Sequence, residues 1–239
     1  MAKLIKIVFV LVVVLGILLV MNLGSGLKTM VETLGPEMTQ SEVSLRRAEI
    51  SLFSGEGSFH DLVIGNPQGF DTPRAFSLGE ISFSLNNESL ATDIIVVESL
   101  RIVAPEVTME SARGGSNLDR IEHNIASFLG TGGQESTEAG KKIVIKDLLI
   151  TDGKLKYALV GDKTLELPLP ELHLTNIGEP GQGLSMAEAS AKIIAAISKG
   201  ASKTVLNSGS LKDIGGDLEG QIKDKASKIK GLFKGLKTP

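Results

Sequence analysis

A long N-terminal run without charge constrains this chain more than any other feature. No residue from Ile7 to Leu27 is charged, and Lys3 and Lys6 precede the run. A helix that rises about 1.5 Å per residue needs roughly 20 such residues to cross about 30 Å of hydrocarbon. We therefore expect residues 1–27 to form a single-pass transmembrane anchor, whose two lysines keep the N-terminus in the cytoplasm.

A cleaved secretory signal is the alternative interpretation of this run. Such signals have an apolar core of about 7–15 residues and then a cleavage site between small residues. The densest stretch, Ile7–Met21, lies at the top of that range, and residues 22–26 offer small side chains but no clean A-x-A. The pattern favours an uncleaved anchor with most of the chain beyond the membrane, and cleavage stays open.

Composition removes several classes of function. The chain has no cysteine, so disulfides and thiolate metal sites are excluded. One tyrosine and no tryptophan argue against stacking platforms for nucleic acid. The formal net charge is only -3. We expect stability to come from packing alone.

The region over residues 41–178 is dominated by strand-like alternation of apolar and polar residues. The alternation changes phase at Arg46-Arg47, as a bulge would produce. Closely spaced strands favour antiparallel pairing. The expected strands cover residues 43–52, 59–64, 78–85, 94–103, 107–109, 143–150, 155–159, 165–169 and 172–174. The segments Val97–Ser111 and Ile145–Leu159 share one plan, which indicates either a repeat or two ordinary hairpins.

Helical spacing appears in three places. Residues 28–40 are expected to continue the anchor as a linker helix that ends near Gly35-Pro36. Apolar residues recur every three or four positions over 116–129, with Ser116 or Asn117 as the N-cap. Ser185 and Glu188 form a capping-box pattern that opens an alanine-rich helix over 186–206.

The last part of a basic helical tail, expected over 184–239, is a second amphipathic helix at 218–237. Its lysines suit either anionic lipid or simple packing on the domain. Its apolar face is a candidate membrane or partner surface and consists of Leu218, Ile222, Ile229, Phe233 and Leu236.

Motifs for catalysis, cofactors and metals are not found. His60, His123 and His173 have no partners at metal-ligand spacing. The sequence contains no G-x-S-x-G turn and no phosphate-binding glycine loop. We therefore expect a protein that is not an enzyme and that binds neither cofactor nor metal.

Several expected strands carry apolar residues on one face only, and such a face must be covered. A helix or second sheet is the usual cover, and acyl chains in an open groove are the alternative. The candidate lipid-facing residues are Ile81, Phe83, Leu85, Leu155, Tyr157 and Leu159. A complementary apolar face on residues 186–206 would favour coverage by the chain itself.

The segment Gly35–Phe70, with its Gly-Asn-Pro-x-Gly-Phe run, resembles the start of AsmA-like proteins (periplasmic AsmA/TamB/YhdP-type envelope proteins). Val97–Ser111 and Asn117–Ile125 resemble the same family, and the resemblance covers about residues 1–175. It implies a bacterial inner-membrane anchor and a mainly β periplasmic domain with some helix, whose antiparallel sheet curves into an apolar groove.

The resemblance also implies binding or intermembrane transport of phospholipid or another acyl lipid in cell-envelope and outer-membrane biogenesis. Eight to ten strands at about 4.8 Å each span roughly 40–50 Å, which is less than the width of the periplasm. We therefore expect a short groove module at the inner membrane. The alternative is a non-catalytic structural or adaptor protein that docks a protein partner, or a second copy, through its helical tail.

Overall fold

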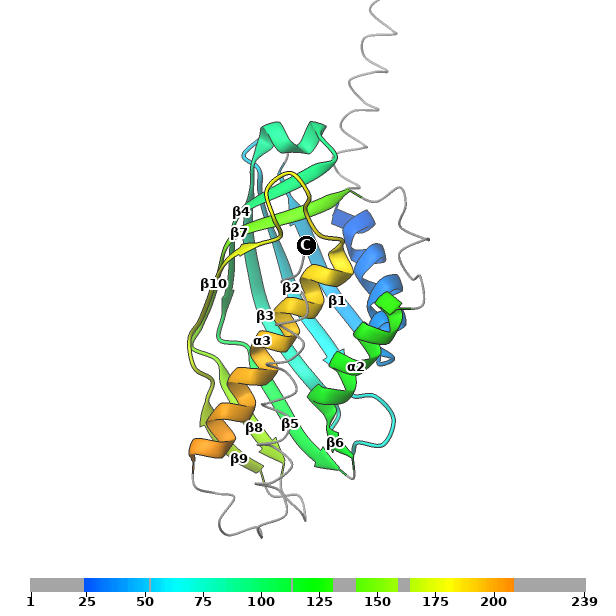
Figure 1. Ribbon diagram of the computed structural model, residues 1–239, viewed down its shortest axis with the longest axis vertical. Helices are drawn as coiled ribbons and strands as arrows, with labels where there is room; N and C mark the ends of the chain where they lie inside the picture. The colour runs from blue at the N-terminus through cyan, green and yellow to red at the C-terminus, as the bar shows by residue number, and fades with distance from the viewer. Residues whose placement is uncertain (1–23, 52, 113, 131–140, 159–163, 209–239) are drawn as a thin grey trace, which may run out of the picture.

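Strands rich in leucine and β-branched residues form one mixed sheet, and helices cover one of its faces (Figure 1). The computed structural model describes residues 24–51, 53–112, 114–130, 141–158 and 164–208. The strands are β1 (Val43–Ile50), β2 (Glu56–Gly65), β3 (Arg74–Leu85), β4 (Ile94–Val103), β5 (Glu106–Ala112), β6 (Gly115–Ser116), β7 (Lys142–Thr151), β8 (Lys154–Ala158), β9 (Thr164–Pro168) and β10 (Leu172–Ile177). The helices are one over residues 24–39, α2 (Asn117–Gly130), α3 (Met186–Asn207) and the short 3-10 helix η1 (Asn87–Ala91).

Strand β3 is the centre of the sheet. It pairs with β2 on one side and with β4 and then β5 on the other, so β1 forms one edge and β10 and β9 form the other. The expectation of an antiparallel sheet is wrong, because β4 pairs with β7 and β5 with β8 in parallel. The connection from β5 to β7 contains α2, and a crossover of this kind is what parallel pairing requires.

The two similar segments of the sequence lie side by side in these parallel pairs. Val97 pairs with Ile145 and Met109 with Tyr157, a constant offset of 48 residues through both pairs of strands. Neither segment is a hairpin, because β4 and β5 do not pair with each other and neither do β7 and β8. Each segment is one bent strand, and the two bends lie next to each other.

The bends belong to a row that crosses most of the sheet, which we call the crease. It consists of Arg46, Asp61, Gly79, Ala104 and Asp152, which are neighbours in the strand registers. Asp61, Ala104 and Asp152 have φ of 51°, 51° and 55°, a left-handed conformation that is uncommon for residues with a side chain.

The crease reverses which side chains face the helices. In β3, Phe76 and Leu78 are buried before the crease and Ile81 after it, so the inward positions change from even to odd numbers. In β1, Val43 and Leu45 are buried before Arg46 and Ala48 after it, so the predicted change of phase is confirmed. A bulge as its cause is wrong, because the register between β1 and β2 is the same on both sides of Arg46.

Helices α2 and α3 close the lower part of the curved sheet, as drawn in Figure 1. The predicted capping box is confirmed: Ser185 Oγ accepts from Glu188 N at 3.2 Å, and Ser185 N donates to Glu188 Oε2 at 2.7 Å. The predicted helix near 116–129 is α2, and Ser116 Oγ accepts from Asp119 N at its start. Ile194, Ile197 and Val205 of α3 are buried in the shared core.

The helix over residues 24–39 runs past the expected end at Gly35-Pro36. Proline removes one donor, but the turn that follows it has hydrogen bonds of its own. Thr39 Oγ1 donates to Gly35 O at 2.8 Å, and Gln40 N donates to Pro36 O at 2.9 Å. These bonds hold the helix to Thr39, whose carbonyl then accepts from Asn124 Nδ2 of α2 at 2.8 Å.

Candidate lipid-facing surface

Three of the predicted lipid-facing residues lie inside the core. Leu155 is 0% exposed, Tyr157 2% and Ile81 6%. The tyrosine hydroxyl lies 3.2 Å from Ser111 Oγ, so its polar end also has a partner. All three belong to the core that the sheet shares with the helices, so lipid would reach them only if this core opened.

The other described candidates, Phe83 and Leu85, are half-buried. They lie on the same strand beyond the crease and share a face of the sheet with half-buried neighbours. We call this group the upper apolar patch, which consists of Phe59, Phe83, Leu85, Ile95 and Val97. In Figure 1 it corresponds to the upper ends of β2, β3 and β4, above α2.

Two phenylalanine rings form the centre of this patch. The centroids of Phe59 and Phe83 are 5.2 Å apart with an interplanar angle of 58°, a tilted arrangement that aromatic pairs favour. A side chain at Gly57 would meet the Phe83 ring at 2.3 Å, so only glycine leaves room for the ring there. The patch is a formed apolar surface that is less covered than the core below it.

The helix over residues 24–39 determines which end of the sheet lies near the predicted anchor. A Cβ at Gly24 would lie 2.2 Å from Ala48 O, and one at Gly35 would lie 2.8 Å from Val43. Residue numbers therefore rise along the helix as they fall along β1, so the two elements are antiparallel. The chain enters this helix at the same end of the sheet as the upper apolar patch.

Two charged side chains of the helix satisfy the backbone of the edge strand. Glu32 Oε1 accepts from Leu45 N at 3.0 Å, and Lys28 Nζ donates both to Leu45 O and to Glu32. The Leu45 amide and then Lys28 hold the pKa of Glu32 below its usual value. This contact covers part of an exposed sheet edge, and the sequence pattern did not indicate it.

The opposite face of the sheet is polar and holds an ion cluster. Asp147 of β7 accepts from His173 Nε2 of β10 at 2.5 Å and from Arg101 of β4 through its other carboxylate oxygen. His173 and then Arg101 hold the pKa of Asp147 below its usual value. The cluster joins three neighbouring strands. The other two histidines, His60 in β2 and His123 in α2, lie in other elements.

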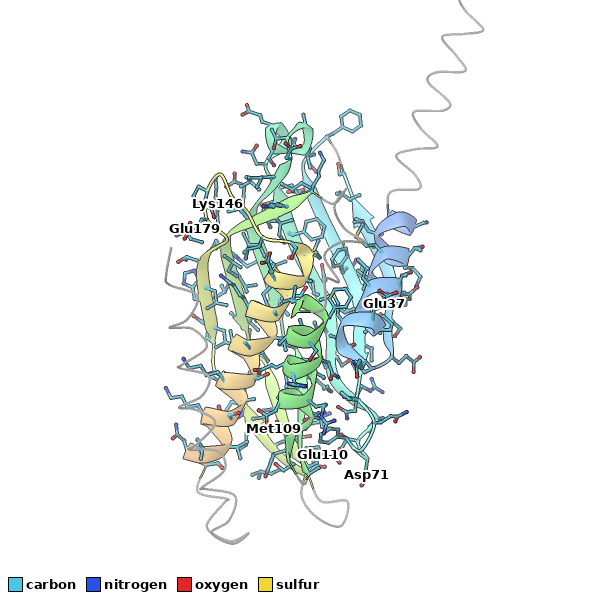
Figure 2. All side chains as sticks on the ribbon, turned by 45° about the vertical axis from the view of Figure 1, so that its right-hand side comes forward. Glu37, Asp71, Met109, Glu110, Lys146 and Glu179 are labelled. Atoms are coloured by element: carbon cyan, nitrogen blue, oxygen red, sulfur yellow. The ribbon has the colours of Figure 1, made fainter. Side chains whose placement is uncertain are left out.

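The Gly-Asn-Pro-x-Gly-Phe run, the most specific part of the family resemblance, lies in a loop held by Glu110. Glu110 accepts from Asp71 N and Thr72 N, both at 2.8 Å, and from Thr72 Oγ1 at 2.6 Å. Burial raises the pKa of Glu110, but the three hydrogen bonds outweigh it and the pKa is lowered. Figure 2 shows Asp71 and Glu110 together at one end of the molecule.

Asn66 and Asn117 extend this network. Asn117 Nδ2 donates to Asn66 Oδ1 at 2.7 Å, and Asn66 Nδ2 donates to Thr72 O at 2.6 Å. Asn117 is 0% exposed, so its amide is part of the core. The motif residue Asn66 therefore has a structural role, joining the loop to the start of α2.

An open depression of about 360 Å³ lies at the end of α3. Its lining residues are Leu167, Pro168, Pro170, Thr204, Asn207 and Ser208. Leu159 and the predicted tail face (Leu218, Ile222, Ile229, Phe233 and Leu236) lie outside the described residues. The predicted anchor also lies outside them, except for residues 24–27.

Within the described ranges, no group of three or more metal-ligating side chains is placed to hold an ion, and no helix is long and apolar enough to span a membrane. Comparison with models of protein families and with curated proteins finds no match to this chain. The resemblance to AsmA-like proteins accordingly remains a prediction from the residues quoted above.

Proposed function

We propose that this is a non-catalytic protein of cell-envelope biogenesis, anchored in the bacterial inner membrane with its bulk in the periplasm. In this proposal the upper apolar patch binds an acyl chain of a membrane phospholipid. The observation that carries the proposal is the coincidence of two features at one end of the sheet. The less covered apolar surface lies where the chain arrives from the predicted anchor.

The position of the patch limits the kind of lipid handling. Lipid reaching Phe83 from the bilayer would meet a surface that ends at buried Ile81, where the core shared by the sheet and the helices begins. The domain would therefore hold part of a lipid close to the membrane. It would act as a base or acceptor for a longer carrier and not as a continuous channel.

Photocrosslinking in the full-length protein tests this directly. A benzophenone amino acid placed at Phe83 should form lipid adducts on illumination of proteoliposomes, detected by mass spectrometry. Ser82 is the matched control, because it directly precedes Phe83 in β3 and is exposed on the opposite face. Equal adduct yields at the two positions, or none at Phe83, would contradict lipid binding at the patch.

A second candidate is a structural or adaptor protein without lipid cargo. The observation that favours it is the coverage of the lower sheet by α3, whose Ile194, Ile197 and Val205 are buried there. If the same reporter captured protein instead of lipid at both Phe83 and Ser82, this second candidate would replace the first.

A further inference from the structure

The turn between β1 and β2 presents one large apolar side chain to solvent. Phe53 is 91% exposed, more than any other large hydrophobic residue in the described parts of the chain. The next, Val103, is 54% exposed and lies beside the crease in the middle of the sheet. Single exposed apolar residues are common on protein surfaces, so Phe53 becomes informative only through its setting.

The turn that carries Phe53 is a well-bonded structure. Gly55 N donates to Ser51 O at 2.8 Å, and Asn87 Nδ2 of η1 donates to Phe53 O at 3.0 Å. Gly55 has φ of 74°, and a Cβ there would lie 2.4 Å from Asn87 Oδ1. The backbone is therefore held against η1 while the phenyl ring points away from protein.

The turn lies beyond the point where the chain enters the domain. Gly24, at the start of the first described helix, is level with Ala48 of β1. Strand β1 then continues for two residues to Ile50, about 7 Å farther on at about 3.3 Å per residue, and the turn with Phe53 follows. Figure 1 agrees, since η1, which contacts the tip, lies above the first turn of this helix (dark blue).

We propose that Phe53 inserts into the interface of the same bilayer that holds the predicted anchor. This inference rests on the proposed anchoring of the chain. Phenylalanine is among the apolar side chains that interfacial segments bury at the boundary between lipid headgroups and acyl chains. Exposed Glu56 and Glu88 lie near the tip and would be repelled by anionic headgroups, so the contact that we propose is made by the phenyl ring alone.

Two contacts with the bilayer would orient the domain. The anchor alone leaves the sheet free to tilt about residues near Gly24. A second contact through Phe53, carried by β1 and β2, holds the upper ends of these strands at the membrane surface. Phe83 of the upper apolar patch, which pairs with Gly57 at the start of β2, is then kept close to the lipid.

The absence of tryptophan from the chain gives a clean test. The full-length variants Phe53→Trp, Val103→Trp and Leu18→Trp each carry a single tryptophan and are reconstituted in phosphatidylcholine vesicles with brominated acyl chains. We expect Phe53→Trp to show a blue-shifted emission and a loss of intensity by bromine quenching. Val103→Trp should keep the red emission of a solvent-exposed indole and should not be quenched.

The Leu18 reporter separates the inference from the anchor on which it rests. Quenching at Leu18 without quenching at Phe53 overturns the membrane contact of the turn and leaves the anchor intact. Quenching at neither position overturns both. Stronger quenching at Phe53 than at Val103 supports the contact whatever the result at Leu18, and equal behaviour of Phe53→Trp and Val103→Trp overturns it.

Discussion

Two regions of the concave face, the core and the upper apolar patch, are built from the same kind of strand but are covered differently. Below the crease, Leu155 and Tyr157 lie beneath α2 and α3 in a closed core. Above it, the upper apolar patch has the same alternation but lacks α2 over it, and Phe83 and Leu85 remain half-buried. Apolar alternation therefore indicates which face of a strand is apolar. It does not indicate whether that face is covered by protein or by another apolar group.

Truncation of a core leucine should have the largest effect. Leu155→Ala removes a fully buried side chain, and such changes cost about 2–5 kcal/mol. Leu85→Ala, in the half-buried patch, should cost about 1 kcal/mol because less apolar surface is returned to water. Urea unfolding of the two variants measures both values. Equal losses of unfolding free energy would show that the core and the upper apolar patch are covered to the same extent.

Loss of Glu110 should have the next largest effect, confined to the lower end. Glu110→Ala leaves the amides of Asp71 and Thr72 without their acceptor, which costs about 1–3 kcal/mol. The matched control is Glu106→Ala on the same strand, which removes a partly exposed ion pair with Lys156 worth about 0–1 kcal/mol. Thermal unfolding measures the midpoint of each variant. An equal fall in the two midpoints would contradict the structural role of Glu110.

Acid should lower the stability of the fold by protonating two carboxylates, Glu110 and Asp147. The pKa values of Glu110 and Asp147 are lower in the folded protein than their ordinary values, so the unfolded chain binds more protons as pH falls. The stabilisation is complete above the ordinary carboxyl pKa of about 4 and is lost as pH drops through the folded values. Unfolding midpoints measured between pH 7 and pH 3 should fall in that window. Glu110→Gln should reduce the slope there, and an unchanged slope would exclude Glu110 as a contributor.

Locking α3 should have the smallest effect on lipid contact. A Cβ at Gly200 would lie 3.4 Å from Leu172 Cδ2, so α3 and β10 are close there, and the chain has no cysteine of its own. Gly200→Cys with Leu172→Cys can therefore be bridged selectively by a short bismaleimide. If lipid enters only the upper apolar patch, adduct yields at Phe83 should be the same with and without the bridge. A fall on bridging would show that lipid also passes beneath α3.

The sequence pattern predicted elements better than it predicted their pairing. The capping box at Ser185 and the phase change at Arg46 are local signals, and both were confirmed. The parallel pairing of β4 with β7 could not be read, because it depends on a crossover through α2 whose path no local pattern encodes. The bulge expected at Arg46 was wrong, since the register of β1 with β2 does not shift there; the neighbouring Asp61 of β2 has a left-handed φ of 51° instead.

The predicted lipid-facing residues differ in burial, and lipid contact stays a prediction for all of them. Alternation could not separate the half-buried Phe83 and Leu85 from Leu155, which has the same pattern and lies under a helix. The Lys28 and Glu32 contacts with Leu45 gave no signal, because a charged pair four residues apart is typical of any exposed helix. The anchor and the tail lie outside the described residues and stay predictions.

The constant offset of 48 residues has a consequence for how such a sheet can grow. Because the bent strand formed by β4 and β5 lies in register with the one formed by β7 and β8, each presents the edge that its successor needs. A further copy of this unit inserted after β8 would take the places that β10 and β9 now hold beside β7 and β8, and would meet matching hydrogen bonds and a matching bend at Asp152. Every added copy would widen the sheet by about 4.8 Å without new architecture, so a chain of this kind can lengthen by duplication alone.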